Sequence, residues 1–590
     1  MPAKKQVKTQ TTAQQLGNII KSSRQIMRKD KGLSGELDRL PVLTWVMFLK
    51  FLDDLEKQQE AKALFDTQTY QPAIAAPYRW RDWAAVEGIT GDGLIEFLNL
   101  ESTTLPNGKT GAGLFTYLRG LQGAEGGDRR DVIATVFQGL QNRMINGYLL
   151  RDVIDKINSI HFNSTEEIHT LSRLYENMLR EMRDAAGDSG EFYTPRPVVE
   201  FMVKVINPQL GESVLDPACG TGGFLVEAAV QLGKQCKTVE HHAALQKSSL
   251  YGGEAKPLPY LMAQMNLLLH GIEYPQIDSG NSLSTALKDI GDKDRVDVIL
   301  TNPPFGGEEE KGILGNFPAD KQTTETAMLF LQLIMRKLKR PGKGSDNGGR
   351  AAVVVPNGTL SAEGVAGRIK EELVQHYNLH TIVRLPEGVF APYTDIPANL
   401  LFFDRSGPTE DIWYYQIPPP EGRKKYTKTK PMQYSEFADC LEWWNQREAN
   451  DFAWKVPFSE KLDEAHQKAQ PHWDNATEAK QYGDKAEQTY KDLEKSLALA
   501  IQAETDQVAD LKKKLKAQKK RVAEWREKQK SEQALGDGIY WPVFNLDMKN
   551  PTSLLPVEYR SPEELVNVIL SKETTIIENL EDIRSLLRGS

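Results

Sequence analysis

The sequence contains little cysteine. Cys219, Cys236 and Cys440 are the three cysteines in 590 residues, and they lie far apart without a CxxC pair. This pattern argues against a disulfide framework and a structural zinc site, and we expect no metal. No hydrophobic run approaches the 18 or more residues of a membrane span, and the polar N-terminus has no apolar export signal. We therefore expect a cytoplasmic protein with no membrane association.

The chain also lacks an excess of positive charge, since its formal net charge is −8. A protein that holds nucleic acid alone is usually basic, because phosphate neutralisation supplies most of that affinity. Either the chain binds no nucleic acid or a partner supplies a cationic surface. Locally basic runs occur at 336–350, 423–430 and 512–526, and each could equally be a solvated face or loop. No GxxxxGK[ST] motif is present, so we do not expect ATP hydrolysis by this chain.

At 590 residues the chain is too long for one hydrophobic core, so several folded units are expected. Helical spacing of apolar residues dominates the first part of the sequence, including LGNIIKSSRQIM, LPVLTWVMFLKFLDDLEKQQEAKALF and TYLRGLQ. A further helix, TEEIHTLSRLYENMLREMRD, has Asn163 or Ser164 as its candidate N-cap. We predict an N-terminal all-α domain over 1–164.

After Gly190, short β-branched runs alternate with helical segments. The strand-like runs are SVLDPA, SLYGGEA, VDVILTN, AAVVVPN, HTIVRLP and NLLFFD, and the helical ones include GGFLVEAAVQL, PYLMAQMNLLLHGI and TAMLFLQLIMRKL. Strands that alternate with helices indicate βαβ units and a mostly parallel sheet covered on both faces. We predict a doubly wound α/β domain over 165–460.

The last part of the chain is helical in pattern. Residues 476–535 are rich in Lys, Glu, Ala and Gln and carry one narrow apolar stripe near seven-residue spacing, which predicts a long helix, coiled coil or helical hairpin. Residues 536–590 form a final segment that ends in a helix capped at Ser561, with Pro562 at its first position. The stripe must pack against something, either a partner protein or its own hairpin.

Two segments place acidic residues where strands are predicted to end. In SVLDPACGTGGFLVEAA, Asp216 is followed by a turn containing Gly220, Gly222 and Gly223, which allow close backbone approach to a ligand. In LYGGEAKP, Glu254 is placed to accept hydrogen bonds from ribose hydroxyls. Because the turn lacks a Walker lysine, it suits a cationic or zwitterionic ligand better than a polyphosphate. A tight βα turn and a surface glutamate remain the alternatives.

The segment VDVILTNPPFGG combines an amide, two prolines and an aromatic ring at a strand end. Pro303 and Pro304 have fixed φ angles and no N–H donors, so they hold Asn302 extended and set the direction of the Pro303 carbonyl. The Asn302 side-chain oxygen and that carbonyl are then two acceptors aimed at one point, beside the face of Phe305. This arrangement fits an amino group on a flat ring.

These motifs together identify a family resemblance. DPACGTGGF followed by NPPF resembles the S-adenosylmethionine-dependent methyltransferases that modify adenine N6 in DNA. LYENMLREM, GEFYTPRPVVEFMV, MNLLLHGI, GNSL and VRLPEGVFAPYTDIPANLLFF resemble the modification subunit of type I restriction-modification systems. The likeness covers most of residues 10–410 and implies a Rossmann-like methyltransferase domain.

The resemblance also implies roles for particular residues. Asn302, Pro303, Pro304 and Phe305 match the catalytic tetrad. The cofactor-binding positions match Tyr193, Thr194, Pro195, Asp216, Gly220, Gly222, Phe224 and Glu254. The acid that often lies near the cofactor adenine is replaced by Asn281, with Asp278 nearby, so the residue that binds this amine stays open.

The implied activity is methyl transfer from S-adenosylmethionine to an adenine turned out of duplex DNA. The implied partners are double-stranded DNA, a specificity subunit, a second modification subunit and a restriction subunit with nuclease and ATPase activity. The C-terminal helices would dock on the specificity subunit. The alternatives are a self-sufficient methyltransferase acting on DNA, RNA or protein glutamine, and an inactive scaffold.

Overall fold

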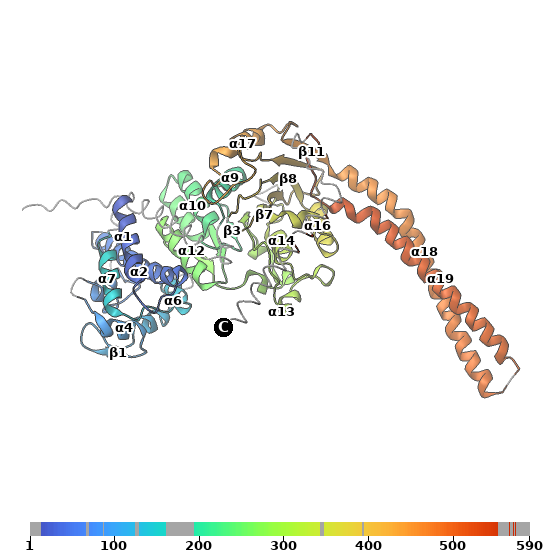
Figure 1. Ribbon diagram of the computed structural model, residues 1–590, viewed down its shortest axis with the longest axis horizontal. Helices are drawn as coiled ribbons and strands as arrows, with labels where there is room; N and C mark the ends of the chain where they lie inside the picture. The colour runs from blue at the N-terminus through green and yellow to red at the C-terminus, as the bar shows by residue number, and fades with distance from the viewer. Residues whose placement is uncertain are drawn as a thin grey trace, which may run out of the picture.

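A computed structural model shows three regions arranged in a row: N-terminal helices, a central α/β unit and a long projecting helical hairpin (Figure 1). The described residues are 13–65, 70–85, 88–123, 129–160, 194–342, 347–391, 394–504, 506–552, 566, 570 and 573. The predicted helix after Asn163 or Ser164 and the helix capped at Ser561 lie outside these residues.

The N-terminal region is built mainly from helices. They are α1 (Ala13–Met27), α2 (Glu36–Phe65), α3 (Trp80–Trp83), α4 (Gly91–Asn99), α5 (Leu114–Arg119), α6 (Arg129–Gln138) and α7 (Gly147–Asn158). The middle of α2 is buried, with Trp45 and Phe48 fully enclosed. A short antiparallel ribbon of β1 (Thr103–Thr104) and β2 (Thr110–Gly111) interrupts the helices, so the prediction of an all-α region was wrong in this detail.

The central unit contains a nine-stranded sheet in the order β11-β10-β8-β9-β7-β6-β3-β4-β5. Its strands are β3 (Val214–Asp216), β4 (Leu250–Gly253), β5 (Gln276–Asp278), β6 (Val298–Thr301), β7 (Arg350–Pro356), β8 (Asn378–Arg384), β9 (Ala398–Asp404), β10 (Asp411–Gln416) and β11 (Ala453–Pro457). All neighbours pair in parallel except those involving β9 and β11, which run antiparallel.

Helices cover both faces of this sheet. They are α9 (Arg196–Ile206), α10 (Gly223–Gln235), α11 (Val239–Ser248), α12 (Pro257–Leu269), α13 (Lys311–Leu314), α14 (Thr326–Lys337), α15 (Asn357–Ser361), α16 (Val365–His376) and α17 (Ala438–Asn445). Strand residues alternate between the faces: Ala352 and Val354 of β7 share a core with α9, α10 and α12, whereas Val353 and Val355 face α14 and α16. This two-sided burial explains the continuous apolar runs in the sequence.

The prediction of a mixed α/β unit with a large, mostly parallel sheet is confirmed, and the predicted strand-like runs correspond to β3, β4, β6, β7, β8 and β9. Strands β5, β10 and β11 and helix α16 were not predicted. Six short 3₁₀ turns complete the described elements of this part: η2 (Ser282–Ser284), η3 (Leu287–Asp289), η4 (Asp292–Asp294), η5 (Ala319–Lys321), η6 (Tyr434–Phe437) and, after the hairpin, η7 (Trp541–Phe544).

The strand order creates a crevice at one edge of the sheet. From β3 the chain moves outward to β4 and β5, and it then returns to β6 on the other side of β3. The loops after β3 and β6 therefore diverge at the carboxyl edge. Such topological switch points are where open α/β sheets bind ligands.

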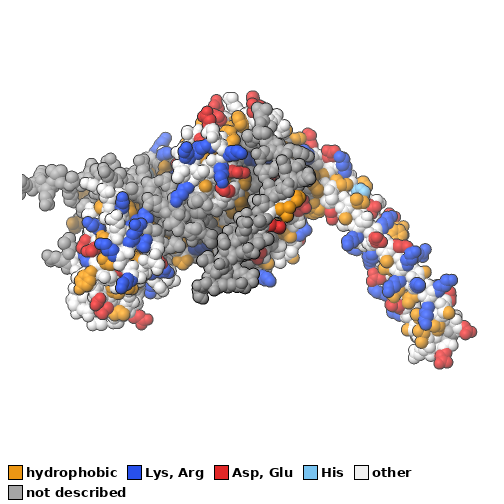
Figure 2. Space-filling view, viewed as in Figure 1, with side chains coloured by type: hydrophobic (Ala, Val, Ile, Leu, Met, Phe, Trp, Pro, Cys, Tyr) orange, Lys and Arg blue, Asp and Glu red, His pale blue; other side chains and the backbone are white. Residues whose placement is uncertain are grey.

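The projecting hairpin consists of α18 (Phe458–Gln502) and α19 (Val508–Tyr540). It begins 18 residues before the predicted start at 476, because α18 continues through Pro471. The two helices pack on each other: Tyr482 stacks on Trp525 at 4.9 Å, and Gln518 Nε2 donates to the Ala486 carbonyl at 2.9 Å. The apolar stripe thus packs within a self-folded hairpin, whereas cationic and acidic side chains are interspersed along its outer surface (Figure 2).

The segment after the hairpin returns to the sheet. Residues 536–540, predicted to open a separate C-terminal segment, belong to α19. The Tyr414 hydroxyl of β10 donates to the Leu546 carbonyl at 3.0 Å in a buried contact. No helix in the described ranges is long and apolar enough to cross a membrane.

The base of the hairpin depends on a close contact at Gly536. A Cβ atom there would lie 2.5 Å from Trp473 Nε1, and this indole is fixed by its hydrogen bond to Asp537 Oδ1 at 3.0 Å. At Gly538 a Cβ would meet nothing within 4 Å. Overpacking should make Gly536→Ala destabilising by about 1 kcal/mol net, whereas Gly538→Ala should stabilise the helix by up to about 1 kcal/mol.

Hydrogen exchange of the amides around Trp473 would measure this difference. Equal protection in the two variants would contradict the prediction.

Candidate functional site

The loops that follow β3, β4 and β5 are locked together by short contacts at the carboxyl edge. The Cys219 N–H donates to the Gly253 carbonyl at 2.9 Å, and the Ser282 hydroxyl donates to the Pro217 carbonyl at 2.7 Å. A Cβ on Gly253 would lie 2.3 Å from the Ser282 Oγ, so glycine is required at this crossing. The loops at this edge are therefore held in fixed positions by contacts within the protein.

The glycine-rich turn opens helix α10. Gly220 and Gly222 have φ angles of 54° and 80°, in the left-handed region that side chains disfavour. Gly222 is the N-cap of α10, and Phe224 follows as a buried residue of the first turn. The turn thereby brings main-chain atoms to the floor of the crevice.

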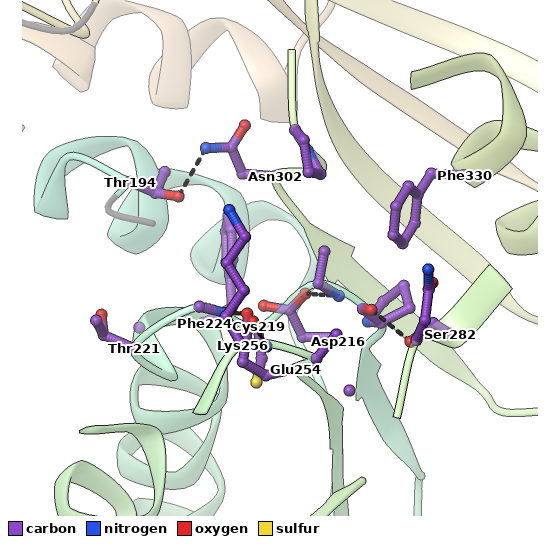
Figure 3. Close-up of a pocket in the computed structure, with 18 of the residues that line it drawn as sticks. Thr194, Asp216, Cys219, Thr221, Phe224, Glu254, Lys256, Ser282, Asn302 and Phe330 are labelled. Carbon is purple, nitrogen blue, oxygen red and sulfur yellow. Dashed lines mark hydrogen bonds between the residues drawn. The ribbon is translucent and has the colours of Figure 1, made fainter. Parts of the chain in front are cut away.

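A cavity of about 230 Å³ lies over this edge (Figure 3). The predicted site residues that line it are Thr194, Asp216, Gly220, Phe224, Glu254, Asn281, Asn302 and Pro304. Four others, Pro195, Gly222, Pro303 and Phe305, flank it without lining it. Tyr193 lies outside the described residues.

Asp216, the last residue of β3, is almost fully buried. Burial, with a smaller contribution from the nearby charge of Glu254, raises the pKa of its carboxyl group to about 7. The Ala218 N–H donates to Asp216 Oδ1 at 3.2 Å. A cation bound beside this carboxylate would favour its ionised form.

Glu254 lies at the carboxyl end of β4 and joins two loops. Its Oε2 accepts from the Gly220 N–H at 3.1 Å, and its Oε1 accepts from the Lys256 N–H at 2.7 Å. Its own N–H donates to the Asp278 carbonyl at 2.9 Å. An ionised carboxylate has about four acceptor positions, which suits contact with a donor such as a hydroxyl group.

Asn302 directly follows β6 and is joined to the start of α9. Its Nδ2 donates to Thr194 Oγ1 at 3.0 Å, a contact between residues 108 positions apart (Figure 3). Its Oδ1 is buried and forms no hydrogen bond with any described residue. A buried acceptor without a partner is costly in a folded protein, so this oxygen is a strong candidate for ligand contact.

The aromatic ring after the two prolines has a second ring beside it. Phe305 is half-buried and packs against Phe390, with ring centroids 5.2 Å apart and planes at 65°. Phe390 belongs to the segment after β8. Sequence reasoning did not single it out, although it lies within VRLPEGVFAPYTDIPANLLFF.

Asp278 and Asn281 differ in their position relative to the cavity. Asp278 is exposed and does not line the cavity, whereas Asn281 does. Asn281 Oδ1 accepts from the Leu283 N–H at 2.9 Å, and its Nδ2 donates to Glu309 Oε2 at 3.4 Å. Glu309, which sequence reasoning missed, is thus the carboxylate that lines this side of the cavity.

Other lining residues also lacked a signal in the sequence. Phe330 of α14 points into the cavity opposite Asn302 (Figure 3), but its helix reads only as apolar core. Asn266 of α12 is nearly buried, and its Oδ1 forms no hydrogen bond with any described residue. Arg196 and Lys256 add two cations to the lining, with Arg196 bonded to Glu227 Oε2 at 2.5 Å.

The cavity lining therefore combines three carboxylates, two amide oxygens that form no hydrogen bond with any described residue, and a flat aromatic ring. This chemistry suits a ligand that carries positive charge, hydroxyl or amino donors and a planar ring. The fold and the site together define the class of α/β methyltransferase-like proteins. A methyltransferase subunit of a type I restriction-modification system from Streptococcus thermophilus, 18% identical, has the same fold with a TM-score of 0.55 over 77% of this chain and 97% of that one.

The family model "N-6 DNA Methylase" matches residues 166–482, and the chain belongs to this family. It is 47% identical over 452 residues, 75% of this chain and 87% of the relative, to the type I restriction enzyme EcoEI methylase subunit of Escherichia coli. The structure of a modification subunit of a putative type I restriction enzyme from Vibrio vulnificus YJ016 is 76% identical and superimposes with a TM-score of 0.72, covering 76% of this chain and 93% of that one.

A further solved chain extends the likeness to almost the whole sequence. It comes from a study of complex assembly and conformational transition in the type I restriction-modification system. It is 34% identical, with a TM-score of 0.68 over 98% of this chain and 99% of that one. The predicted resemblance to type I modification subunits is confirmed.

Because the pKa of Asp216 is raised, replacing it by an uncharged residue should stabilise the folded protein by an amount that depends on pH. Since the folded-state pKa lies near 7 and the unfolded one near 4, the buried charge costs nothing below about pH 4 and its full amount above about pH 7. Asp216→Asn should therefore stabilise the unliganded chain by up to about 4 kcal/mol at pH 8 and scarcely at all at pH 4.

Thermal unfolding across this pH range would measure the gain, with Asp278→Asn as the exposed control. A gain of the same size at both ends of the range would rule out the burial of charge as its cause.

Proposed function

We propose that this chain transfers a methyl group from S-adenosylmethionine to the N6 amine of an adenine in double-stranded DNA, as the modification subunit of a type I restriction-modification complex. The observation that carries this proposal is the buried Asn302 Oδ1, which forms no hydrogen bond with any described residue and belongs to the lining of a cavity that also contains three carboxylates. An extruded adenine offers both an amine for this oxygen and a ring for an aromatic side chain.

The residues present fit the cofactor. Glu254 would accept from the ribose hydroxyls, Asp216 would face the positive charge, and the turn through Gly220 to Phe224 would allow the close approach of the amino-acid part. When bound, S-adenosylmethionine supplies a methyl group activated by a sulfonium. Thr194 and Asn302 both line this cavity and are joined by a hydrogen bond.

Asn302 acts on the target amine by accepting a hydrogen bond from it. The lone pair of an adenine N6 amine is delocalised into the ring, which makes the nitrogen a poor nucleophile. Acceptors at Asn302 Oδ1 and the Pro303 carbonyl favour a tetrahedral nitrogen and so return this pair to it. The Thr194 hydroxyl accepts from Asn302 Nδ2, and in this orientation the amide oxygen is left for the incoming base.

Phe305 and Phe390 provide the aromatic wall for the extruded base. The two rings pack edge to face. One ring can therefore stack on the base while the other ring holds it in position. Stacking on this wall would offset part of the cost of removing the base from the duplex. Holding amine and methyl donor in line then supplies much of the acceleration, without a covalent intermediate on the protein.

Glu309 would bind the amine of the cofactor adenine. The Asn281 oxygen is already used by the Leu283 N–H, whereas the Glu309 carboxylate has acceptor sites left after its contact with Asn281. The Glu309 N–H donates to the Thr324 carbonyl at 3.1 Å, which fixes the residue close to the helix that carries Phe330. A purine between Phe330 and this carboxylate would have both its ring and its amine satisfied.

The partners proposed are duplex DNA, a specificity subunit, a second modification subunit and a restriction subunit. The likeness to a chain solved in a study of type I complex assembly supports a role in an assembly of several subunits. A self-sufficient methyltransferase is the alternative, and an inactive scaffold is disfavoured by the retained Asp216, Glu254 and Asn302. Labelled methyl transfer to mixed DNA, with and without the specificity subunit, separates these functions; efficient site-specific transfer by the chain alone would defeat the subunit proposal.

Asn302→Ala should separate catalysis from cofactor binding. Methyl transfer by the assembled complex should fall by about 100-fold or more, because the charge-stabilising acceptor is lost. Affinity for S-adenosylhomocysteine, measured by calorimetry, should stay within about threefold of the parent value. Parallel loss of both would refute this division of roles.

Glu309→Gln should weaken S-adenosylhomocysteine binding by about tenfold, because a hydrogen bond to a charged acceptor is lost. The neighbouring Glu308→Gln, at an exposed position of the same acidic run, is the matched control and should leave binding within about twofold.

An analogue with a carbonyl in place of the adenine amine distinguishes recognition from folding. Its affinity should not fall in the Glu309→Gln variant. A fall as large as that for S-adenosylhomocysteine would show that Glu309 acts on the fold of the cavity.

A further inference from the structure

A basic loop, defined here as residues 422–433 between β10 and η6, has no part in the site described above. It contains Arg423, Lys424, Lys425, Lys428 and Lys430 and no acidic residue, in a chain whose formal net charge is −8. A local concentration of cations in an acidic chain creates a positive field that the overall charge does not reveal.

The basic loop lies at the same edge of the sheet as Asn302. Strand β10 pairs in parallel with β8, and β8 runs in the same direction as β6 because the single antiparallel strand β9 lies between β8 and β7. The carboxyl ends of β6, β8 and β10 therefore share one edge, and each is followed by a loop that extends from it.

The loop is held in place by Tyr426. The Tyr426 ring is buried, its hydroxyl donates to Glu436 Oε1 at 2.7 Å, and its N–H donates to the Glu387 carbonyl at 3.0 Å. A Cβ on Gly388 would lie 2.1 Å from the Tyr426 carbonyl oxygen, so the two backbones are in direct contact. The cations are thus displayed on an anchored loop.

The same segment connects the basic loop to the candidate base site. Gly388 touches the loop, and Phe390, two residues later, packs against Phe305 at 5.2 Å. Phe305 is three residues from Asn302. A continuous set of contacts therefore runs from Tyr426 to the aromatic wall where the base would enter.

The cationic side chains differ in their surroundings. Lys425 forms an ion pair with Asp395 at 2.7 Å, and Arg423 lies over the Tyr426 ring and donates to the Lys430 carbonyl at 3.2 Å. The side chains of Lys424, Lys428 and Lys430 are exposed. Glu387 is an exposed acid beneath the loop, and Glu421 directly precedes it, so the field is positive only on the outer side.

We propose that the basic loop binds the phosphate backbone of duplex DNA on the side of the aromatic pair Phe305 and Phe390. This assignment rests on the proposed function and extends it by naming a DNA-contact surface on this chain. Contacts to phosphates fix the position of a protein on DNA without reading its sequence. The loop would therefore position the duplex, and sequence reading would belong to the specificity subunit.

The test replaces Lys424, Lys428 and Lys430 together by Gln. The matched control replaces Lys512, Lys513 and Lys516, which are exposed on α19, and makes the same change in net charge. Each chain is assembled with its specificity subunit, and binding to a labelled duplex of about 30 base pairs is followed from about 50 to 300 mM salt.

We expect the loop variant to bind DNA at least about tenfold more weakly at the lower salt. The slope of its log affinity against log salt should be smaller in magnitude by about 2 to 3. The control variant should keep the parent slope. An unchanged slope in the loop variant would overturn the proposal, and so would tighter, loop-dependent binding of a single-stranded RNA of equal length.

Two further measurements keep the interpretation clear. An unchanged affinity of the loop variant for S-adenosylhomocysteine shows that the cavity is folded. Loop-dependent DNA binding by a complex that transfers no methyl group would refute the proposed function while supporting the loop assignment. Normal methyl transfer with loop-independent DNA binding would refute the loop assignment while supporting the proposed function.

Discussion

The site depends on the parallel pairing of β3 with β4 on one side and β6 on the other. This register places Asp216, Glu254 and Asn302 at one edge, although they are separated by up to 86 residues in the sequence. Main-chain hydrogen bonds between the loops, such as Cys219 to Gly253, then fix their separation. The chemistry of the cavity follows from this pairing, since none of the three residues has its position set by local sequence alone.

The same edge carries polar groups whose burial is unfavourable. Asp216 is a buried acid whose pKa is raised by that burial, and Asn302 holds a buried oxygen with no hydrogen bond to a described residue. Around them, β6 and β7 are packed with aliphatic side chains on both faces. Unfavourable polar groups within a well-packed frame are typical of sites organised for a ligand.

Much of the fold, and several residues of the candidate site, could be predicted from motifs in the sequence. The strand runs around Asp216, Glu254 and Asn302 were predicted because buried parallel strands read as continuous apolar segments bounded by turn residues. Glu309, Phe330 and Phe390 were missed because their contribution depends on tertiary placement. One lies in an acidic run, one in an apolar helix and one in a loop, and nothing in those local patterns distinguishes them from solvent-exposed or core residues.

A helical hairpin was one of the predicted alternatives, but its start was placed at residue 476, because the composition typical of a long helix begins only there. Its 45 residues give α18 a length of about 65 Å. It therefore acts geometrically as a lever, since a rotation of one degree at its base displaces the far end by about 1 Å. Small rearrangements near Trp473 and Gly536 would be magnified at the tip into shifts as large as a side chain.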